Sequence, residues 1–508
     1  MSDGSDQDAP PLEVCDLVIA ARPDFADGHR ARGDALYRLG RLHEAIGSYG
    51  RAIALAPDPA RALFNRGIIF QALNRPAEAL ADFDAVVALA PDSADAHSNR
   101  GLALQDLGRL DAALASFDRA IALAPDSIAA HTNRGVVLQD LDRAEDAIAA
   151  FDAAIALRPD FAEAHANRGH ALQDLLRSQE ALDSYDRAIA ARPDFARASW
   201  AKGLALMQLG RMGKGWALFE RRAAEYAPNA RRTFAEPAWS GEADIAGKTL
   251  FVHWEQGFGD TLQFCRYAGV AADRGARVVL SVQDPLLRLM KRLDPRVTVI
   301  GGAEQPAVFD LHCPLMSLPL ALGLSDEAMP VDVPYLSADP ADLAVWRARL
   351  PATGRPRIGL AWSGAPAQKN DRNRSMDLRR LQPLLDLDAD WVCLQKDVRD
   401  ADAGALAKEG RLRIVADDLR DFADTAALVE TLDLVVSVDT SVAHLAGALG
   451  KPVWVMLTYN ADWRWLLGRT DSPWYPSARL FRQPARSDWP SVAQDVRSAI
   501  MSRFGMPA

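Results

Sequence analysis

The sequence predicts an α-helical solenoid followed by an α/β part that folds as two doubly wound lobes. A 34-residue period runs through the first 225 residues: an Asn-Arg-Gly triplet recurs at this spacing from Asn65 to Asn167, and the prolines that close each unit keep the same spacing. From Lys248 onward this period is lost, and short β-rich runs alternate with helical segments, which is typical of parallel sheets with crossover helices. A proline-rich interval over 330–356 separates two such sets.

Length and composition narrow the class of protein. The 508 residues exceed a single hydrophobic core, and 49% apolar with 25% charged residues are typical of a folded globular chain. The formal net charge of −10 argues against general binding to nucleic acid or to an anionic membrane, because both need a basic face. No signal-peptide pattern opens the chain, and no stretch reaches the roughly 18 uninterrupted apolar residues of a membrane helix. We therefore expect a cytoplasmic protein that neither binds nucleic acid nor inserts into a membrane.

Each 34-residue unit predicts a helix, a turn and a second helix. In the unit that ends at Pro125, small or apolar residues recur at helical spacing on both sides of the turn at 107–109. Gly101 leaves room where the two helices approach, Phe117 fills the gap between them, and Pro125 ends the second helix. These positions resemble the tetratricopeptide repeat, and the resemblance covers about five units.

The repeats imply a surface that holds a protein. Stacked units form a superhelix whose first helices line a concave groove. An asparagine amide both donates and accepts hydrogen bonds, which suits it to gripping the backbone of an extended peptide. The alternative is that the asparagines only bond neighbouring turns. The expected client-binding ladder consists of Asn65, Asn99, Asn133 and Asn167.

The units depart from the usual repeat pattern at two positions in the first helix. Histidine replaces a bulky aromatic residue, and we expect it to pack, because side chains about 10 Å apart on successive units cannot share one metal ion. Arginine precedes the glycine in five units. After Pro193 the pattern decays, as expected of a terminal unit that faces a different surface. The substituted positions are His29, His97, His131 and His165, and Arg32, Arg66, Arg100, Arg134 and Arg168.

Two loops at the expected carboxyl ends of strands carry the chemistry, because ligands of doubly wound sheets bind there. The first loop holds Gly257, Gly259 and Asp260 ahead of a helix that we expect to begin near Leu262. Glycines let a ligand approach the backbone, and a helix start offers free N–H groups. The loop lacks the full GxGxxG and GK[ST] patterns, so neither NAD binding nor ATP hydrolysis is indicated. Asp260 could be a general base or only the cap of its helix.

The second loop follows an apolar strand and opens another helix. The helix dipole, free backbone amides and the hydroxyls of Thr440 and Ser441 converge there, as a phosphate or pyrophosphate requires. Capping of the helix by Asp439 or Thr440 is the alternative. His444, one turn into the helix, could face either the ligand or the sheet.

Together the two loops resemble the glycosyltransferase family that includes the lipopolysaccharide heptosyltransferases (glycosyltransferase family 9). The resemblance covers roughly residues 247–500 and implies a GT-B fold of two Rossmann-like lobes. It also implies that Asp260 is the catalytic base and that Asp439 and Thr440 hold the donor's phosphates, with Ser441 in place of the usual glycine. The whole layout resembles bacterial repeat-bearing glycosyltransferases, including the flagellin-modifying type.

Three further segments carry charged or aromatic side chains. Lys369, Arg372 and Arg374 could neutralise the donor's phosphates or a sugar carboxylate, or they could be a solvated surface run. The aromatic and basic run at 462–465 could stack on a sugar or nucleobase, or pack between the lobes. The acidic run at 386–390 imitates a DxD metal motif, but it precedes a strand on the side away from the cleft. We therefore expect no metal and no cofactor, with the nucleotide sugar as co-substrate.

These predictions give one domain organisation and one preferred function. We expect a protein O-glycosyltransferase that is inverting and metal-independent, and that transfers sugar to Ser or Thr of a client such as flagellin held by the repeats. The alternatives are a non-enzymatic repeat adaptor with a vestigial GT-B module, and a glycosyltransferase that acts on an envelope or lipid-linked sugar. The expected segments are an acidic N-terminus with a capping helix (1–25), the solenoid (26–227), a linker (228–247), the first lobe (248–335), an inter-lobe linker (336–355) and the nucleotide-sugar lobe (356–508).

Overall fold

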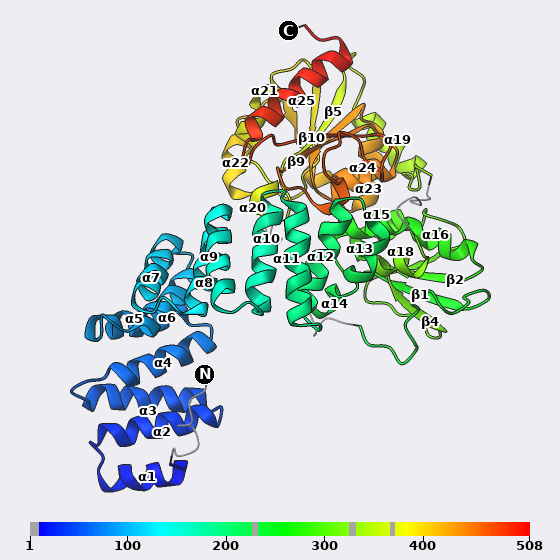
Figure 1. Ribbon diagram of the computed structural model, residues 1–508. Helices are drawn as coiled ribbons and strands as arrows, with labels where there is room; N and C mark the ends of the chain where they lie inside the picture. The colour runs from blue at the N-terminus through cyan, green and yellow to red at the C-terminus, as the bar shows by residue number, and fades with distance from the viewer. Residues whose placement is uncertain (1–9, 226–231, 325–331, 366–370, 508) are drawn as a thin grey trace. The chain divides into compact units, whose positions relative to one another are not determined.

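The structure, a computed structural model, describes residues 10–225, 232–324, 332–365 and 371–507. It consists of two compact units, Met1–Ala198 and Ser199–Ala508. The first unit is a helical solenoid, and the second contains two parallel sheets with helices around them (Figure 1). The predicted fold class, an α-solenoid followed by two doubly wound lobes, is therefore confirmed. Within the described ranges, no helix is long and apolar enough to cross a membrane.

The first unit is a succession of antiparallel helix pairs. A lone helix, α1, precedes the first pair, and each later pair supplies one first helix and one second helix. First helices of successive pairs also contact each other, α2 with α4, α4 with α6, α6 with α8 and α8 with α10, so that they line one continuous face. The bounds are α1 Leu12–Ala21, α2 Ala26–Arg38, α3 Leu42–Leu55, α4 Ala60–Ala72, α5 Pro76–Leu89, α6 Ala94–Asp106, α7 Leu110–Leu123, α8 Ile128–Asp140, α9 Ala144–Leu157, α10 Ala162–Asp174 and α11 Ser178–Ala191.

Each pair closes on a contact between a glycine and an aromatic ring. A Cβ placed on the glycine of the first helix would lie between 2.5 and 2.8 Å from the ring of the second helix, closer than side-chain atoms approach. The rings are almost completely buried, so they cannot move aside. The prediction from Gly101 and Phe117 is confirmed for five units. The contacts are Gly33–Tyr49, Gly67–Phe83, Gly101–Phe117, Gly135–Phe151 and Gly169–Tyr185.

The histidines and most of the arginines of the first helices link neighbouring pairs. Each of the four histidines bonds through Nε2 to the carbonyl oxygen of a proline six residues earlier, at 2.8–3.1 Å, so the prediction that they pack is confirmed. Arg100 donates to Asp84 of the preceding pair at 2.6 Å and to Ser116 of its own pair at 2.7 Å. Arg66 donates instead to the buried Asp82 of its own pair, at 2.6 and 2.8 Å.

The terminal repeat helices are α12 (Ala196–Gln208), most of which belongs to the second unit, and α13 (Met212–Phe219). A first lobe with a parallel sheet of order β3-β2-β1-β4 follows, and then a second lobe with a parallel sheet of order β10-β9-β8-β5-β6-β7. The strands are β1 Thr249–His253, β2 Arg277–Ser281, β3 Thr298–Ile300, β4 Leu311–Pro314, β5 Arg357–Ala361, β6 Asp390–Cys393, β7 Leu412–Arg413, β8 Leu434–Val438, β9 Val453–Leu457 and β10 Ala478–Arg482. The other helices are α14 Arg222–Glu225, α15 Phe258–Phe264, α16 Arg266–Asp273, α17 Asp284–Met290, α18 Leu318–Ala321, α19 Pro340–Arg349, α20 Asp371–Arg374, α21 Gln382–Leu385, α22 Asp400–Leu406, α23 Phe422–Glu430, α24 Ser441–Ala448 and α25 Trp489–Phe504, with 3₁₀ turns η1 Leu315–Ser317, η2 Leu378–Leu381, η3 Ala416–Asp418 and η4 Trp463–Trp465.

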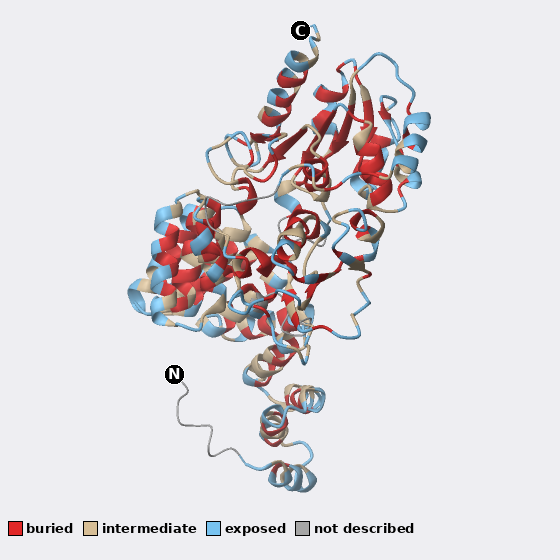
Figure 2. Ribbon diagram, turned by 90° about the vertical axis from the view of Figure 1, so that its right-hand side faces the viewer, coloured by how far each residue is buried: buried red, intermediate tan, exposed pale blue. Residues whose placement is uncertain are grey.

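The second sheet is covered on both faces. Every residue of β8 and β9 is buried, as expected of parallel strands between two helix layers. Figure 2 shows red, buried strands in the part of the chain that ends at the C-terminus. Chain order reverses at β5, which pairs with β8 on one side and β6 on the other. Ligands of doubly wound sheets bind beyond the carboxyl ends of the strands at such a point.

The terminal repeat helices pack on both lobes. Gln208 of α12 donates to Asn460 and to the carbonyl oxygen of Ala461 in the second lobe, at 2.7 and 2.8 Å. Arg222, next to α13 and only 2% exposed, donates to Glu255 of the first lobe at 2.8 Å. The repeat pattern decays here because its side chains contact the α/β part instead of another repeat.

The glycine–ring contact gives a test of the solenoid's packing. Gly135→Ala should lower the free energy of unfolding by about 1–3 kcal/mol, because its Cβ would lie 2.5 Å from Phe151. Gly47→Ala is the control, since nothing lies within 4 Å there and alanine favours a helix by up to about 1 kcal/mol. All 12 tryptophans lie after residue 199, so urea unfolding of the solenoid is followed by far-UV circular dichroism and that of the α/β part by fluorescence. Equal stability of the two variants would contradict the packing account.

Candidate functional site

The two predicted loops meet where α15 of the first lobe packs against α24 of the second. The expectation that the first helix begins near Leu262 is wrong, because α15 begins at Phe258. The carboxylate of Asp260 accepts a hydrogen bond from the Gly257 N–H at 2.9 Å, which caps the helix early and places Asp260 in its first turn. Capping and a role as base remain compatible, because an ionised carboxylate has about four lone-pair sites and the cap uses one of them.

The two glycines of the first loop have separate local roles. A Cβ on Gly259 would lie 3.0 Å from Cδ2 of His444 and 3.7 Å from Cα of Ser441, so its absence lets α15 and α24 approach. Gly257 supplies the N–H that Asp260 caps. Contact of either glycine with a donor stays a prediction.

Asp260 is held in the contact between the lobes. Its side chain is 16% exposed, and its second oxygen is paired with the guanidinium of Arg464 from η4. Burial raises the pKa of the Asp260 carboxyl above its ordinary value, and the charge of Arg464 opposes that rise. Arg464 also donates to Gln263 at 2.7 Å and to Asp462 at 2.9 Å.

The aromatic residues beside Arg464 pack between the lobes. Trp463 and Trp465 are 5% and 0% exposed, so the packing alternative describes them rather than stacking on a ligand. Arg464 itself was not among the predicted site residues. The charge of the run at 462–465 could have pointed to it, but its partners in α15 are 201 and 204 residues away in the chain.

The N-terminus of α24 has no side-chain cap among the described residues. Thr440 is the cap residue by position, but its hydroxyl lies 3.1 Å from Ser437 and bonds no amide of the helix. The capping alternative for Asp439 and Thr440 therefore does not describe this helix. The first backbone amides of α24, from Ser441 onward, lie just after the carboxyl end of β8, together with the positive end of the helix dipole.

Asp439 and His444 lie close together beside these amides. The Oδ1 atom of Asp439 is 3.9 Å from Nε2 of His444, and burial raises the pKa of Asp439 to about 6. His444 turns toward the aromatic layer: it bonds the Tyr475 hydroxyl at 2.9 Å and stacks on Trp465 at 5.4 Å between ring centroids. Burial lowers the pKa of His444 well below its ordinary value, so the ring is neutral near pH 7.

One predicted cation is anchored at the site. Arg374 donates to the carbonyl oxygen of Asp439 at 2.9 Å, and a Cβ on Gly364 would overlap its guanidinium. Arg372 is exposed, and Lys369 lies outside the described residues. Arg399 was not predicted. Its position just after β6 could have indicated it.

Arg399 ties the basic loop to the carboxyl ends of the strands. Its guanidinium pairs with the buried Asp371 and donates to Ser375 at 2.7 Å and to the carbonyl oxygen of Gly364 at 3.1 Å. Arg374 and Arg399 thereby place two guanidinium groups beyond the ends of β5, β6 and β8, on the same edge of the sheet as the start of α24.

The asparagine ladder of the repeats is partly engaged in bonds within the solenoid. Asn65 donates to Asp34 of the preceding pair at 2.9 Å, Asn99 to a carbonyl oxygen of its own helix at 2.9 Å, and Asn167 accepts from Arg197 at 2.7 Å. All four asparagines, including Asn133, are partly exposed. Three of the four therefore bond atoms within the solenoid, and peptide holding stays a prediction.

A second polar row runs beside the asparagines. It was not predicted, although the same 34-residue step reveals it. Gln105 donates to Asp140 of the next unit at 3.0 Å, and Gln139 bonds His170 at 3.1 Å, so the row also links successive first helices. The row consists of Gln71, Gln105, Gln139 and Gln173.

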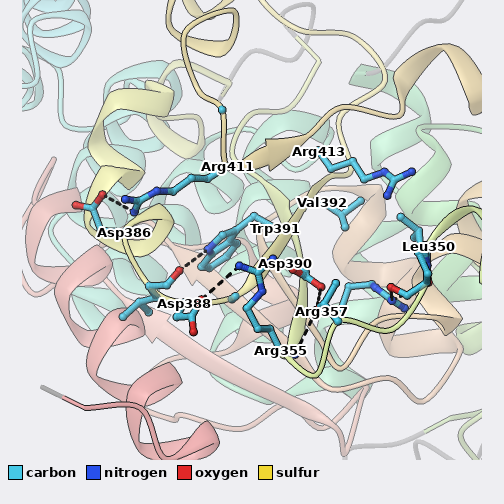
Figure 3. Close-up of a pocket in the computed structure, with 15 residues that line it drawn as sticks. Leu350, Arg355, Arg357, Asp386, Asp388, Asp390, Trp391, Val392, Arg411 and Arg413 are labelled. Carbon is cyan, nitrogen blue, oxygen red and sulfur yellow. Dashed lines mark hydrogen bonds and ion pairs between the residues drawn. The ribbon is translucent and has the colours of Figure 1, made fainter.

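A cavity of about 550 Å³ lies at the opposite, amino end of the second sheet (Figure 3). The acidic run at 386–390 lines it, away from α24 as predicted. The carboxylates are ion-paired, Asp390 with Arg355 at 2.6 Å and Asp386 with Arg411 at 3.1 Å. The acidic run therefore forms ion pairs at the amino end of the second sheet.

Comparison with known families separates the two parts of the chain. The tetratricopeptide repeat family matches residues 18–62, 30–94, 64–128 and 167–230, and a further TPR repeat matches 140–175. Glycosyltransferase family 9 (heptosyltransferase) matches residues 393–493, which include Asp439, Ser441 and Arg464 but not Asp260.

Among known proteins, Protein FlbA of Caulobacter vibrioides is 29% identical over 286 residues. That match covers 52% of this chain and 48% of the relative, so it spans about half the length of each. Among solved structures, YrrB, a TPR protein with an unusual peptide-binding site, is 24% identical over 38% of this chain and all of its own, with a TM-score of 0.34. MamA is 25% identical over 32% of this chain and 96% of its own, with a TM-score of 0.31.

The family matches agree with the positions of the glycine–ring contacts and of the second parallel sheet. The chain thus joins tetratricopeptide repeats in its N-terminal part to a glycosyltransferase family 9 domain at its C-terminus.

Proposed function

We propose that this protein is a cytoplasmic glycosyltransferase that uses a nucleotide sugar and modifies Ser or Thr of a protein client held by the repeats. The observation that carries the proposal is the meeting of Asp260 with the uncapped start of α24 between two parallel sheets. A glycosyltransferase needs a proton acceptor beside the attacking hydroxyl and positive groups beside the leaving phosphate. These two requirements match the two sides of the α15–α24 contact.

The donor's phosphates would bind at the start of α24. Its free amides and helix dipole favour an anion, and Arg374 and Arg399 add positive charge on the same edge of the sheet. These groups would stabilise the charge that develops on the departing phosphate, so the transfer would not need a metal ion. Asp439 would remain as a neighbour that orients His444 and Arg374 rather than as a phosphate ligand, because its own negative charge opposes that of the phosphate.

The transfer would proceed by direct displacement. The client's hydroxyl oxygen forms a bond to the anomeric carbon, the bond from that carbon to the phosphate oxygen breaks, and its electron pair leaves with the nucleotide. Asp260 takes the hydroxyl proton. Attack from the side opposite the phosphate inverts the anomeric centre.

The repeats support a protein as acceptor. Their first helices present an asparagine row and a glutamine row on one face, and both amide types can bond a peptide backbone. Flagellin is the first client to test, from the resemblance of the layout to flagellin-modifying enzymes.

Replacing the proposed base tests the function directly. Asp260→Asn should reduce transfer by about 10²–10⁴-fold, because the amide cannot accept the proton, while donor binding stays close to that of the wild type. Asp388→Asn, at the opposite end of the second sheet, should leave transfer unchanged. The measurement is the mass gain of flagellin after incubation with nucleotide sugars. Undiminished transfer by Asp260→Asn would remove this residue from the mechanism.

The anchored cation gives a second test. Arg374→Gln should weaken donor binding about tenfold or more, as expected for loss of a charge-assisted contact to phosphate. Gly364→Ala should have the same effect without changing any charge, because its Cβ would displace the Arg374 guanidinium. Gly404→Ala is the control, since nothing lies within 4 Å of that position. Calorimetric titration with the donor measures all three, and wild-type affinity in Gly364→Ala would show that the position of Arg374 does not matter.

A further inference from the structure

Arg464 connects the two lobes at the proposed base. It belongs to η4 of the second lobe, yet two of its three side-chain partners, Asp260 and Gln263, belong to α15 of the first lobe. Its third partner, Asp462, holds the guanidinium from its own turn at 2.9 Å. These three partners and the burial of the side chain, which is only 10% exposed, hold the Arg464 guanidinium in this orientation. Its ion pair in turn holds the carboxylate of Asp260.

The turn that carries Arg464 is held in place by the terminal repeat helices. Trp216 of α13 packs edge-to-face on Trp463 at 5.4 Å between ring centroids, and the Arg464 guanidinium lies 4.5 Å from the centre of the same Trp463 ring. Gln208 of α12, 5% exposed, donates to Asn460 and to the carbonyl oxygen of Ala461 just before the turn. A continuous set of contacts therefore runs from α12 and α13 through the turn to Asp260.

From these contacts we infer that Arg464 is a positioning residue for Asp260, and that the terminal repeat helices α12 and α13 position Arg464. The inference rests on the proposed function, in which Asp260 accepts the hydroxyl proton. It makes the last repeat unit part of the apparatus for transfer, in addition to any role of the repeats in holding a client.

The consequence for the chemistry is electrostatic. Burial favours the protonated form of Asp260, which cannot act as a base, and the adjacent positive charge of Arg464 favours the ionised form. Removing that charge should raise the pH at which the base becomes available. Other charged or titratable groups around α15 remain unchanged in such a variant: Asp462, Asp439, His444, Arg266, Tyr335 and the Arg222–Glu255 pair.

The test is the pH dependence of kcat/KM in Arg464→Gln. An opposite charge at hydrogen-bond distance lowers the pKa of an aspartate by about 1–3 units, so the acid limb of the profile should move up by about that amount. Transfer should fall near pH 7 and recover partly at higher pH. Arg464→Lys, which keeps the charge but not the planar fork, should keep the limb and lower kcat. Arg357→Gln is the matched control, because Arg357 bonds carbonyl oxygens beside the cavity of Figure 3.

A second variant tests the contribution of the repeat helices without changing the aromatic residues around Trp463. Gln208→Ala deletes the two hydrogen bonds to the loop before η4, and the acid limb should move in the same direction as in Arg464→Gln, with donor affinity unchanged. A loss of equal size at every pH in Arg464→Gln, or a Gln208→Ala profile identical to that of the wild type, would overturn the inference. Absence of transfer by the wild-type chain with every donor would instead overturn the proposed function itself.

Discussion

The close approach of α15 to α24 is the contact on which the site depends. Among the described residues the two sheets share no strand pairing, so the lobes are connected by side-chain contacts, by helix packing and by a backbone hydrogen bond from Tyr335 N–H to the Ala448 carbonyl oxygen. Gly259 permits the approach because any side chain there would meet His444. Arg464 then joins the lobes at Asp260. A second connection lies farther along the same interface, where Arg288 of α17 pairs with Asp421 and Asp424 beside and within α23. The proposed base and the proposed phosphate site face each other only while these contacts hold.

Glycine contacts and arginine ion pairs also determine how the helices of the solenoid pack. A missing side chain sets the distance between helices, and arginine side chains then join neighbouring pairs. Other units carry an aspartate that pairs with the arginine of the following pair, but Gly50 occupies that position before Arg66. Arg66 pairs instead with Asp82 in the second helix of its own pair, where most other units carry a serine. The charge of Arg66 is thus balanced within its own pair, because a partly buried guanidinium without an acid would destabilise the stack.

Much of this architecture could be predicted from the sequence, because it depends on short-range patterns. Gly101 with Phe117 indicates the repeat, and the apolar runs that became β5, β8 and β9 indicate a parallel sheet. The early start of α15 was missed, since it depends on a hydrogen bond between Asp260 and Gly257 that no apolar period reveals. The contact of Arg464 with Asp260 joins residues 204 positions apart, and only tertiary packing brings them together. The short strands β3 and β7 carry too few residues for a period to register.

The central claim is that a nucleotide sugar binds at the start of α24, and thermal unfolding followed by tryptophan fluorescence tests it most directly. The chain would be heated with UDP-, GDP-, ADP- and CMP-sugars, alongside Thr440→Trp, whose indole would fill the space before Ser441. A donor at about one hundred times its Kd should stabilise the second unit by roughly 2.7 kcal/mol. The account predicts stabilisation by one nucleotide class and its loss in the variant. A folded wild-type chain that responds to none of the donors, or a variant that responds as strongly as the wild type, would contradict it.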